Sequence, residues 1–129
     1  MPKPLILCID DEELGLRIRK IVLEREGYRV ETAINGTIGL TIFEGQEIDA
    51  VVLDYFMPGM NGGEVAAEMR RMKPEVPILL LSAYINLPQD VISAVDSTIL
   101  KGDGPEVLLT KVREVLPPKA DTMEDGGLV

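Results

Sequence analysis

Five short apolar runs, each followed by a charge or a turn and separated by segments of helical spacing, constrain the fold of this chain most. The runs are PLILCID, YRVETAI, IDAVVLDYF, VPILLLSAY and STILKG. The most apolar of them lack the alternation of a half-exposed strand, which is typical of central parallel strands covered on both faces. The pattern predicts an α/β domain, a (βα)₅ doubly wound parallel sheet with right-handed crossovers and helices on both faces.

The segments between the runs carry helix signals. Leu14, Ile18, Ile21 and Val22 form an apolar stripe at helical spacing, and Gly27 is a good C-terminal cap for that helix. Further helices are expected over residues 36–44, 62–73 and 105–116, with only a short one over residues 88–95.

Length and composition limit the function classes. A chain of 129 residues is long enough for one domain with a core and too short for two ordinary ones. Its net charge of −9 argues against direct nucleic-acid binding, because that binding depends on clustered Lys and Arg. A single cysteine, Cys8, cannot form an internal disulfide, so a reducing, cytoplasmic location is expected.

The two ends of the chain give weaker signals. The first apolar run is interrupted by Asp10 and Asp11 before it could serve as a signal-peptide core, and no run approaches the roughly 20 residues that cross a bilayer. No membrane contact is therefore expected. Residues 117–129 contain two prolines, several charges and few large apolar residues, which predicts a disordered tail or a linker remnant.

Carboxylates stand at the ends of two predicted strands. Asp10 and Asp11 end the first strand and Asp54 ends the third. In an open α/β sheet, ligands bind beyond the carboxyl ends of the strands. If the first and third strands are neighbours, the three carboxylates converge, and a hard divalent cation such as Mg²⁺ would relieve their repulsion.

Two further polar residues stand at the ends of the fourth and fifth strands. Ser82 follows ILLL and Lys101 follows STIL. A lysine can pair with a developing phosphoryl charge, and a hydroxyl can donate to a phosphoryl oxygen. Together with a metal ion and a carboxylate nucleophile, these groups indicate phosphoryl transfer.

The segments CIDDEE, VVLDYFMPGMNG, LLLSAY and the strand before Lys101 resemble the CheY-like receiver domain of two-component response regulators. The resemblance covers nearly all of residues 1–116, which we assign to the receiver domain. It implies a flavodoxin-like strand order 2-1-3-4-5, and a switch that takes a phosphoryl group from a sensor histidine kinase or a phosphotransfer protein and alters a protein interaction surface. It implies no separate substrate, and it leaves the downstream partner and homodimerisation open.

The resemblance also implies roles for individual residues. Asp54 would accept the phosphoryl group. Asp11, Asp54 and the backbone carbonyl of Phe56 would ligate Mg²⁺ (or Mn²⁺), with Asp10 acting largely through bound water. Ser82 would shift toward the phosphoryl group, and Lys101 would bridge to it.

Some positions depart from the family pattern. Gly102 replaces the proline that commonly follows the lysine, and Thr98 replaces the usual switch aromatic. Signalling through an aromatic rotamer therefore cannot operate in its usual form. Tyr84 would either substitute for the missing ring or cover the site. Neither Phe56 nor Tyr84 offers an acid or amide to position a hydrolytic water, which predicts a long-lived phosphorylated state.

Two alternative functions remain open at this stage. A degenerate receiver would bind its partner without phosphorylation, as Thr98 and Gly102 would allow. A haloacid-dehalogenase-like phosphohydrolase would use Asp54 as a nucleophile, but such enzymes usually place a second aspartate two residues later, where this chain has Phe56. A nucleotide or flavin site is weaker still, because no glycine-rich phosphate loop follows the first strand.

Overall fold

The computed structural model describes residues 3–116, so the predicted tail at residues 117–129 lies outside the described residues. Within them, five parallel strands form one sheet in the order β2-β1-β3-β4-β5, which confirms the order that the resemblance implied. The strands are β1 (Leu5–Ile9), β2 (Arg29–Ala33), β3 (Ala50–Asp54), β4 (Ile78–Ser82) and β5 (Ser97–Leu100).

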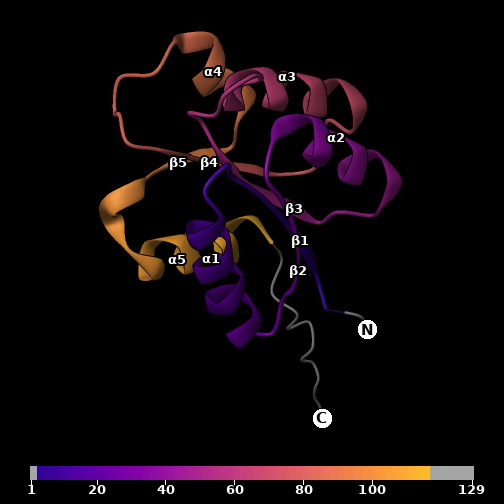
Figure 1. Cartoon of the computed structure of the whole chain (residues 1–129), viewed down its shortest axis with the longest axis vertical. Coiled ribbons are helices and arrows are strands. Elements are labelled where there is room, and N and C mark those ends of the chain that lie inside the picture. The colour runs from indigo at the N-terminus through magenta and orange to yellow at the C-terminus, as the bar shows by residue number, and fades with distance from the viewer. Residues whose placement is uncertain (1–2, 117–129) are drawn as a thin grey trace.

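The helices alternate with the strands and cover both faces of the sheet. They are α1 (Glu13–Arg25), α2 (Gly36–Gly45), α3 (Gly62–Met72), α4 (Gln89–Ala94) and α5 (Pro105–Val115), with a 3₁₀ turn, η1 (Lys101–Asp103), before α5. Helices α1 and α5 lie on one face, and α2, α3 and α4 lie on the other (Figure 1). None of the helices in residues 3–116 combines the length and apolarity of a membrane span.

The core is divided by the sheet into two layers. Strands β1, β3 and β4 are buried along their whole length, as the unbroken apolar runs predicted. Because successive strand side chains point to opposite faces, Leu7 joins the layer under α2, α3 and α4, while Cys8 joins the layer under α1 and α5. Phe43 and Met69 fill the first layer without exposure to solvent, and this packing fixes the strand ends where the polar residues stand.

The apolar stripe predicted on α1 is helical, but of its four residues only Val22 packs against the core. Leu14, Ile18 and Ile21 are 68%, 52% and 53% exposed, whereas Leu16 and Leu23 are the buried residues of this helix. With 3.6 residues per turn, a two-residue offset rotates a side chain by about 200°, so Leu14, Ile18 and Ile21 lie opposite the buried pair. Most of the stripe is therefore on the exposed side of α1.

Candidate functional site

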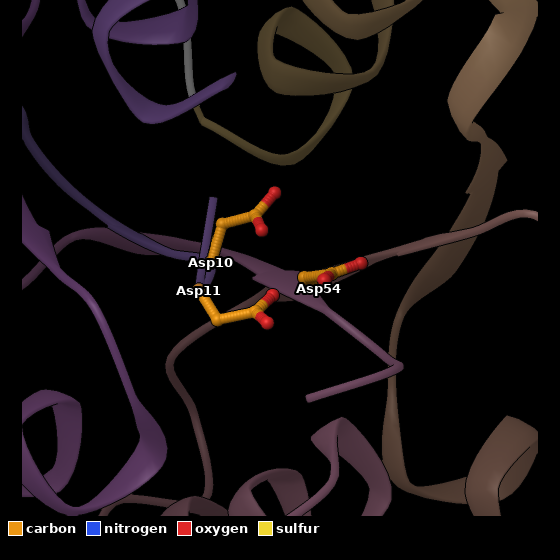
Figure 2. Close-up of side chains that lie close together, drawn as sticks. All are labelled: Asp10, Asp11 and Asp54. Atoms are coloured by element: carbon orange, nitrogen blue, oxygen red, sulfur yellow. The ribbon is translucent and has the colours of Figure 1, made fainter. Parts of the chain in front are cut away.

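The acidic cluster is placed by the register of two neighbouring strands. Ile9 pairs with Leu53, so the next residues, Asp10 and Asp54, leave adjacent strands at the same edge of the sheet. Carboxylate oxygens of Asp10, Asp11 and Asp54 lie within 4.8 Å of one another. Figure 2 shows the three side chains brought together from the ends of β1 and β3. Asp10 and Asp54 are buried, and Asp11 is exposed.

The surroundings of the two buried carboxylates shift their pKa values in opposite directions. Burial raises the pKa of Asp54 to about 6, with a further upward effect from the charge of Asp10 and an opposing effect from its hydrogen bond with Lys101. Burial also raises the pKa of Asp10, but the backbone hydrogen bond from Glu12 and the charges of Arg19 and Lys101 outweigh it and leave that pKa below its usual value. Asp10 therefore carries its charge readily, while the charge on Asp54 is disfavoured.

Lys101 lies against both buried carboxylates. Its Nζ is 3.0 Å from Oδ1 of Asp54 and 3.6 Å from Oδ2 of Asp10. Burial alone would lower the pKa of Lys101, but the hydrogen bond and the charge of Asp54 raise it above its usual value. No cis peptide bond occurs in residues 3–116, and Gly102 follows the lysine inside the turn η1. The lysine thus reaches Asp54 from a loop without a proline.

Ser82 stands at the same edge but is engaged with its own loop. Asp54 pairs with Leu81, so Ser82 lies one residue further along the neighbouring strand. Its Oγ accepts a hydrogen bond from the backbone N–H of Tyr84 at 2.9 Å and donates to the carbonyl of the same residue at 3.0 Å. The ring of Tyr84 is 60% exposed, so the two residues close a turn in which the hydroxyl is buried and the ring is not.

The loop after Asp54 folds back on the backbone of this residue. A Cβ at Gly62 would stand 2.6 Å from the carbonyl oxygen of Asp54 and 2.7 Å from Cα of Tyr55, which leaves room only for glycine. Gly59 adopts φ +80°, a conformation that favours glycine. Asn61 then caps α3 in a capping box. Phe56 lies in this loop two residues after Asp54 and before Gly59, and its side chain is exposed.

One charged residue of the site was not singled out from the sequence. Arg19, from α1, forms an ion pair with Oδ2 of Asp10 through its Nη2 atom. Gly15 precedes it by four residues and therefore lies on the same side of the helix. A glycine in the first turn of this helix, shortly after a strand-end aspartate and four residues before an arginine, was the signal that could have found this contact.

The donor set fits a hard cation. All the side-chain ligands of this cluster are carboxylate oxygens, which Mg²⁺ prefers. The cluster contains no thiolate or imidazole, the ligands that softer metals prefer. Burial raises the pKa of Asp54, and the hydrogen bond and charge of Lys101 do not bring it back to its usual value. The residues present therefore suit a divalent cation such as Mg²⁺.

The comparisons with known proteins agree with this geometry. A family model described as "Response regulator receiver domain" matches residues 6–113. The chain belongs to the response regulator receiver family. Its relatives include the uncharacterized transcriptional regulatory protein YkoG of Bacillus subtilis, which is 33% identical over 98% of this chain, and the transcriptional regulatory protein AfsQ1 of Streptomyces coelicolor, 34% identical over 98%. The chain spans 57% and 59% of the length of these two regulatory proteins.

Solved structures of receivers show the same fold. The response regulator TrrA of Thermotoga maritima, in a complex with Mg²⁺ and BeF, has a TM-score of 0.83 and 38% identity, over 88% of this chain and 99% of that one. TrrA in complex with the histidine kinase ThkA has a TM-score of 0.81 and 37% identity over the same shares. This receiver is thus a two-component signalling module, and its relatives are signalling proteins.

Proposed function

We propose that this receiver takes a phosphoryl group onto Asp54 from the phosphohistidine of a sensor histidine kinase or phosphotransfer protein. The observation that carries the proposal is the meeting of three carboxylates within 4.8 Å, with the Nζ of Lys101 3.0 Å from Asp54. The complex of TrrA with Mg²⁺ and BeF supports a metal-dependent site in a receiver of the same fold. The proposed reaction changes the state of the protein and turns over no separate substrate.

The chemistry balances on the groups of the site. An Oδ atom of Asp54 attacks phosphorus, an O–P bond forms, and the P–N bond of the phosphohistidine breaks with its electron pair returning to the imidazole. Burial of Asp54 keeps water away from the nucleophile, because its side chain is almost wholly enclosed. Lys101 already contacts Asp54 and is placed to pair with the added phosphoryl oxygens.

The remaining roles concern the metal ion and the hydroxyl. Asp11, Asp54 and the backbone carbonyl of Phe56 would hold Mg²⁺ (or Mn²⁺), with Asp10 acting through water. When bound, the ion supplies positive charge that draws in the phosphoryl oxygens and favours ionised Asp54. Ser82 would exchange its hydrogen bonds with the loop for one to a phosphoryl oxygen, which couples phosphorylation to the loop after β4.

Two surfaces bear on the partners of this receiver. The exposed stripe of Leu14, Ile18 and Ile21 on α1 begins beside the acidic cluster, and it suits the docking of a kinase that must bring its phosphohistidine to Asp54. On the output side, Thr98 is exposed in β5 and α4 has only six residues. We therefore infer that this receiver signals through a rearranged loop after β4, without an aromatic switch in β5.

Incubation with acetyl phosphate and MgCl₂, followed by mass spectrometry, tests the proposal. We expect one adduct with the mass of a phosphoryl group, located on Asp54, absent from Asp54→Asn and absent when EDTA replaces the metal. An unmodified wild-type protein would favour the degenerate receiver. Sustained release of phosphate from p-nitrophenyl phosphate, faster than from Asp54→Asn, would favour the phosphohydrolase.

A further inference from the structure

Arg19 places a second cation inside the acidic cluster. Its side chain is only 16% exposed, and its Nη2 atom pairs with Oδ2 of Asp10, whose side chain is 1% exposed. The other oxygen of Asp10, Oδ1, accepts a hydrogen bond of 3.0 Å from the backbone N–H of Glu12. Both oxygens of this carboxylate are therefore engaged by the protein itself.

Gly15 provides the space that the guanidinium of Arg19 occupies. A Cβ at position 15 would stand 3.1 Å from Nη2 and 3.6 Å from Nη1 of Arg19, and 3.6 Å from Oδ2 of Asp10. Gly15 is the third residue of α1 and lies in the first turn of this helix. A side chain here would compete with the ion pair for the same space, so the glycine and the arginine form one local arrangement.

The two cations of the site share Asp10, but only Lys101 also pairs with Asp54. Lys101 contacts both Asp54 and Asp10, whereas the ion pair of Arg19 is with Asp10. Opposite charges this close in a buried site attract strongly, and the pairing opposes withdrawal of either member. A divalent cation that is attracted to Asp10 must therefore compete with Arg19 for this carboxylate.

We propose that Arg19 is an internal counter-ion that competes with the divalent cation for Asp10 and thereby lowers the metal affinity of the site. This inference rests on the proposed function only in taking Mg²⁺ as the ion. Arg19 also lines a pocket of about 160 Å³ between α1, β5 and α5, together with Val22, Leu108 and Lys101.

The opposite role makes the opposite prediction. If Arg19 merely orients Asp10 for the metal ion, its removal weakens Mg²⁺ binding. If Arg19 competes with the ion, its removal strengthens binding. The sign of the change in affinity therefore separates a counter-ion from a structural support.

Isothermal titration of the metal-free protein with MgCl₂ measures this sign without any phosphoryl donor. For Arg19→Met we expect a dissociation constant about tenfold lower than in the wild type, on the scale of one unit charge a few ångströms from the ion. Arg19→Lys keeps the charge and should stay close to the wild type. Arg17→Met is the matched control, because Arg17 is an exposed arginine of the same helix and its loss changes the net charge equally.

The outcomes separate this inference from the proposed function. Magnesium binding that is equal in Arg19→Met and Arg17→Met, or weaker in Arg19→Met, overturns the counter-ion role while leaving the metal site intact. Absence of Mg²⁺ and Mn²⁺ binding from every variant overturns the metal dependence of the proposed function, and the counter-ion role with it. If Arg19→Met fails to fold by circular dichroism, Gly15→Leu, which fills the guanidinium's space and keeps its charge, carries the same test and must also tighten binding.

Discussion

Replacing Asp54 with Asn should stabilise the metal-free protein at neutral pH. The pKa of Asp54 lies at about 6 in the fold against an ordinary value of 3.8. At about pH 3 and below the carboxyl is largely protonated in both the folded and the unfolded chain, so it adds almost no penalty, and near pH 4 the penalty is still below about 1 kcal/mol. Above pH 6 the folded chain must ionise a group that burial and Asp10 disfavour, which costs about 3 kcal/mol at 1.36 kcal/mol per unit of pKa. Asn cannot ionise, and its amide oxygen can still accept from Lys101.

Urea unfolding in EDTA at pH 4 and at pH 7.5 measures this difference. We expect the free energies of unfolding of the wild type and Asp54→Asn to be similar at pH 4, and the variant to be more stable by about 2–3 kcal/mol at pH 7.5. Glu75→Gln, which removes an exposed carboxylate after α3, controls for the change in net charge. Adding MgCl₂ at pH 7.5 should stabilise the wild type more than the variant, since the ion favours ionised Asp54.

Two results would refute this reasoning. The first is a stability difference between the wild type and Asp54→Asn that does not change between pH 4 and pH 7.5, because packing and not ionisation would then account for it. The second is a variant that is less stable than the wild type at pH 7.5, which would mean that the ion pair with Lys101 outweighs the burial of Asp54.

Two further predictions concern the loop that follows Asp54. Gly62→Ala should lower the free energy of unfolding by about 2 kcal/mol or more, because its Cβ would stand 2.6 Å from the backbone carbonyl oxygen of Asp54; urea unfolding measures the loss, and an unchanged midpoint would show that the loop can move aside. Phe56→Asn should shorten the lifetime of the phosphorylated protein, because an amide two residues after Asp54 can position water where the exposed ring cannot; decay of the adduct in magnesium buffer measures it, and an equal or longer lifetime would contradict the role assigned to Phe56.

Much of the fold was predictable because parallel strands that are buried on both faces have unbroken apolar sequences. The unbroken apolar runs of β1, β3 and β4 predicted their central positions, and the short α4 was expected from the distance between Pro88 and Val95. The face of α1 was not predictable from its stripe, because Leu14, Ile18 and Ile21 are apolar and yet exposed. Hydrophobic periodicity records which residues share a face, and it does not distinguish packing on the sheet from an exposed surface.

The convergence of the acidic residues could be predicted from the strand order. The contacts of Lys101 and Arg19 with them depend on side-chain positions that the strand order does not give. Asp10 and Asp54 meet because β1 and β3 are neighbours in register. The contact of Lys101 with Asp54 depends on the path of η1, which a glycine-rich loop leaves open in the sequence. Gly15, four residues before Arg19, is visible in the sequence, but only the side-chain packing shows that it lies against the ion pair of Arg19 with Asp10.

The two cations are distributed unequally between the two buried carboxylates: both pair with Asp10, and only Lys101 pairs with Asp54. Asp10 is held by Arg19 and by the backbone of Glu12, and its pKa falls below the usual value. Asp54 has Lys101 as its ion-pair partner, which it shares with Asp10, and its pKa stays raised. Because the ionised form of Asp54 is disfavoured in the metal-free site, its free energy falls most when a metal ion adds positive charge beside it. The unequal distribution of cations therefore makes Asp54, and not Asp10, the carboxylate whose state responds to what binds.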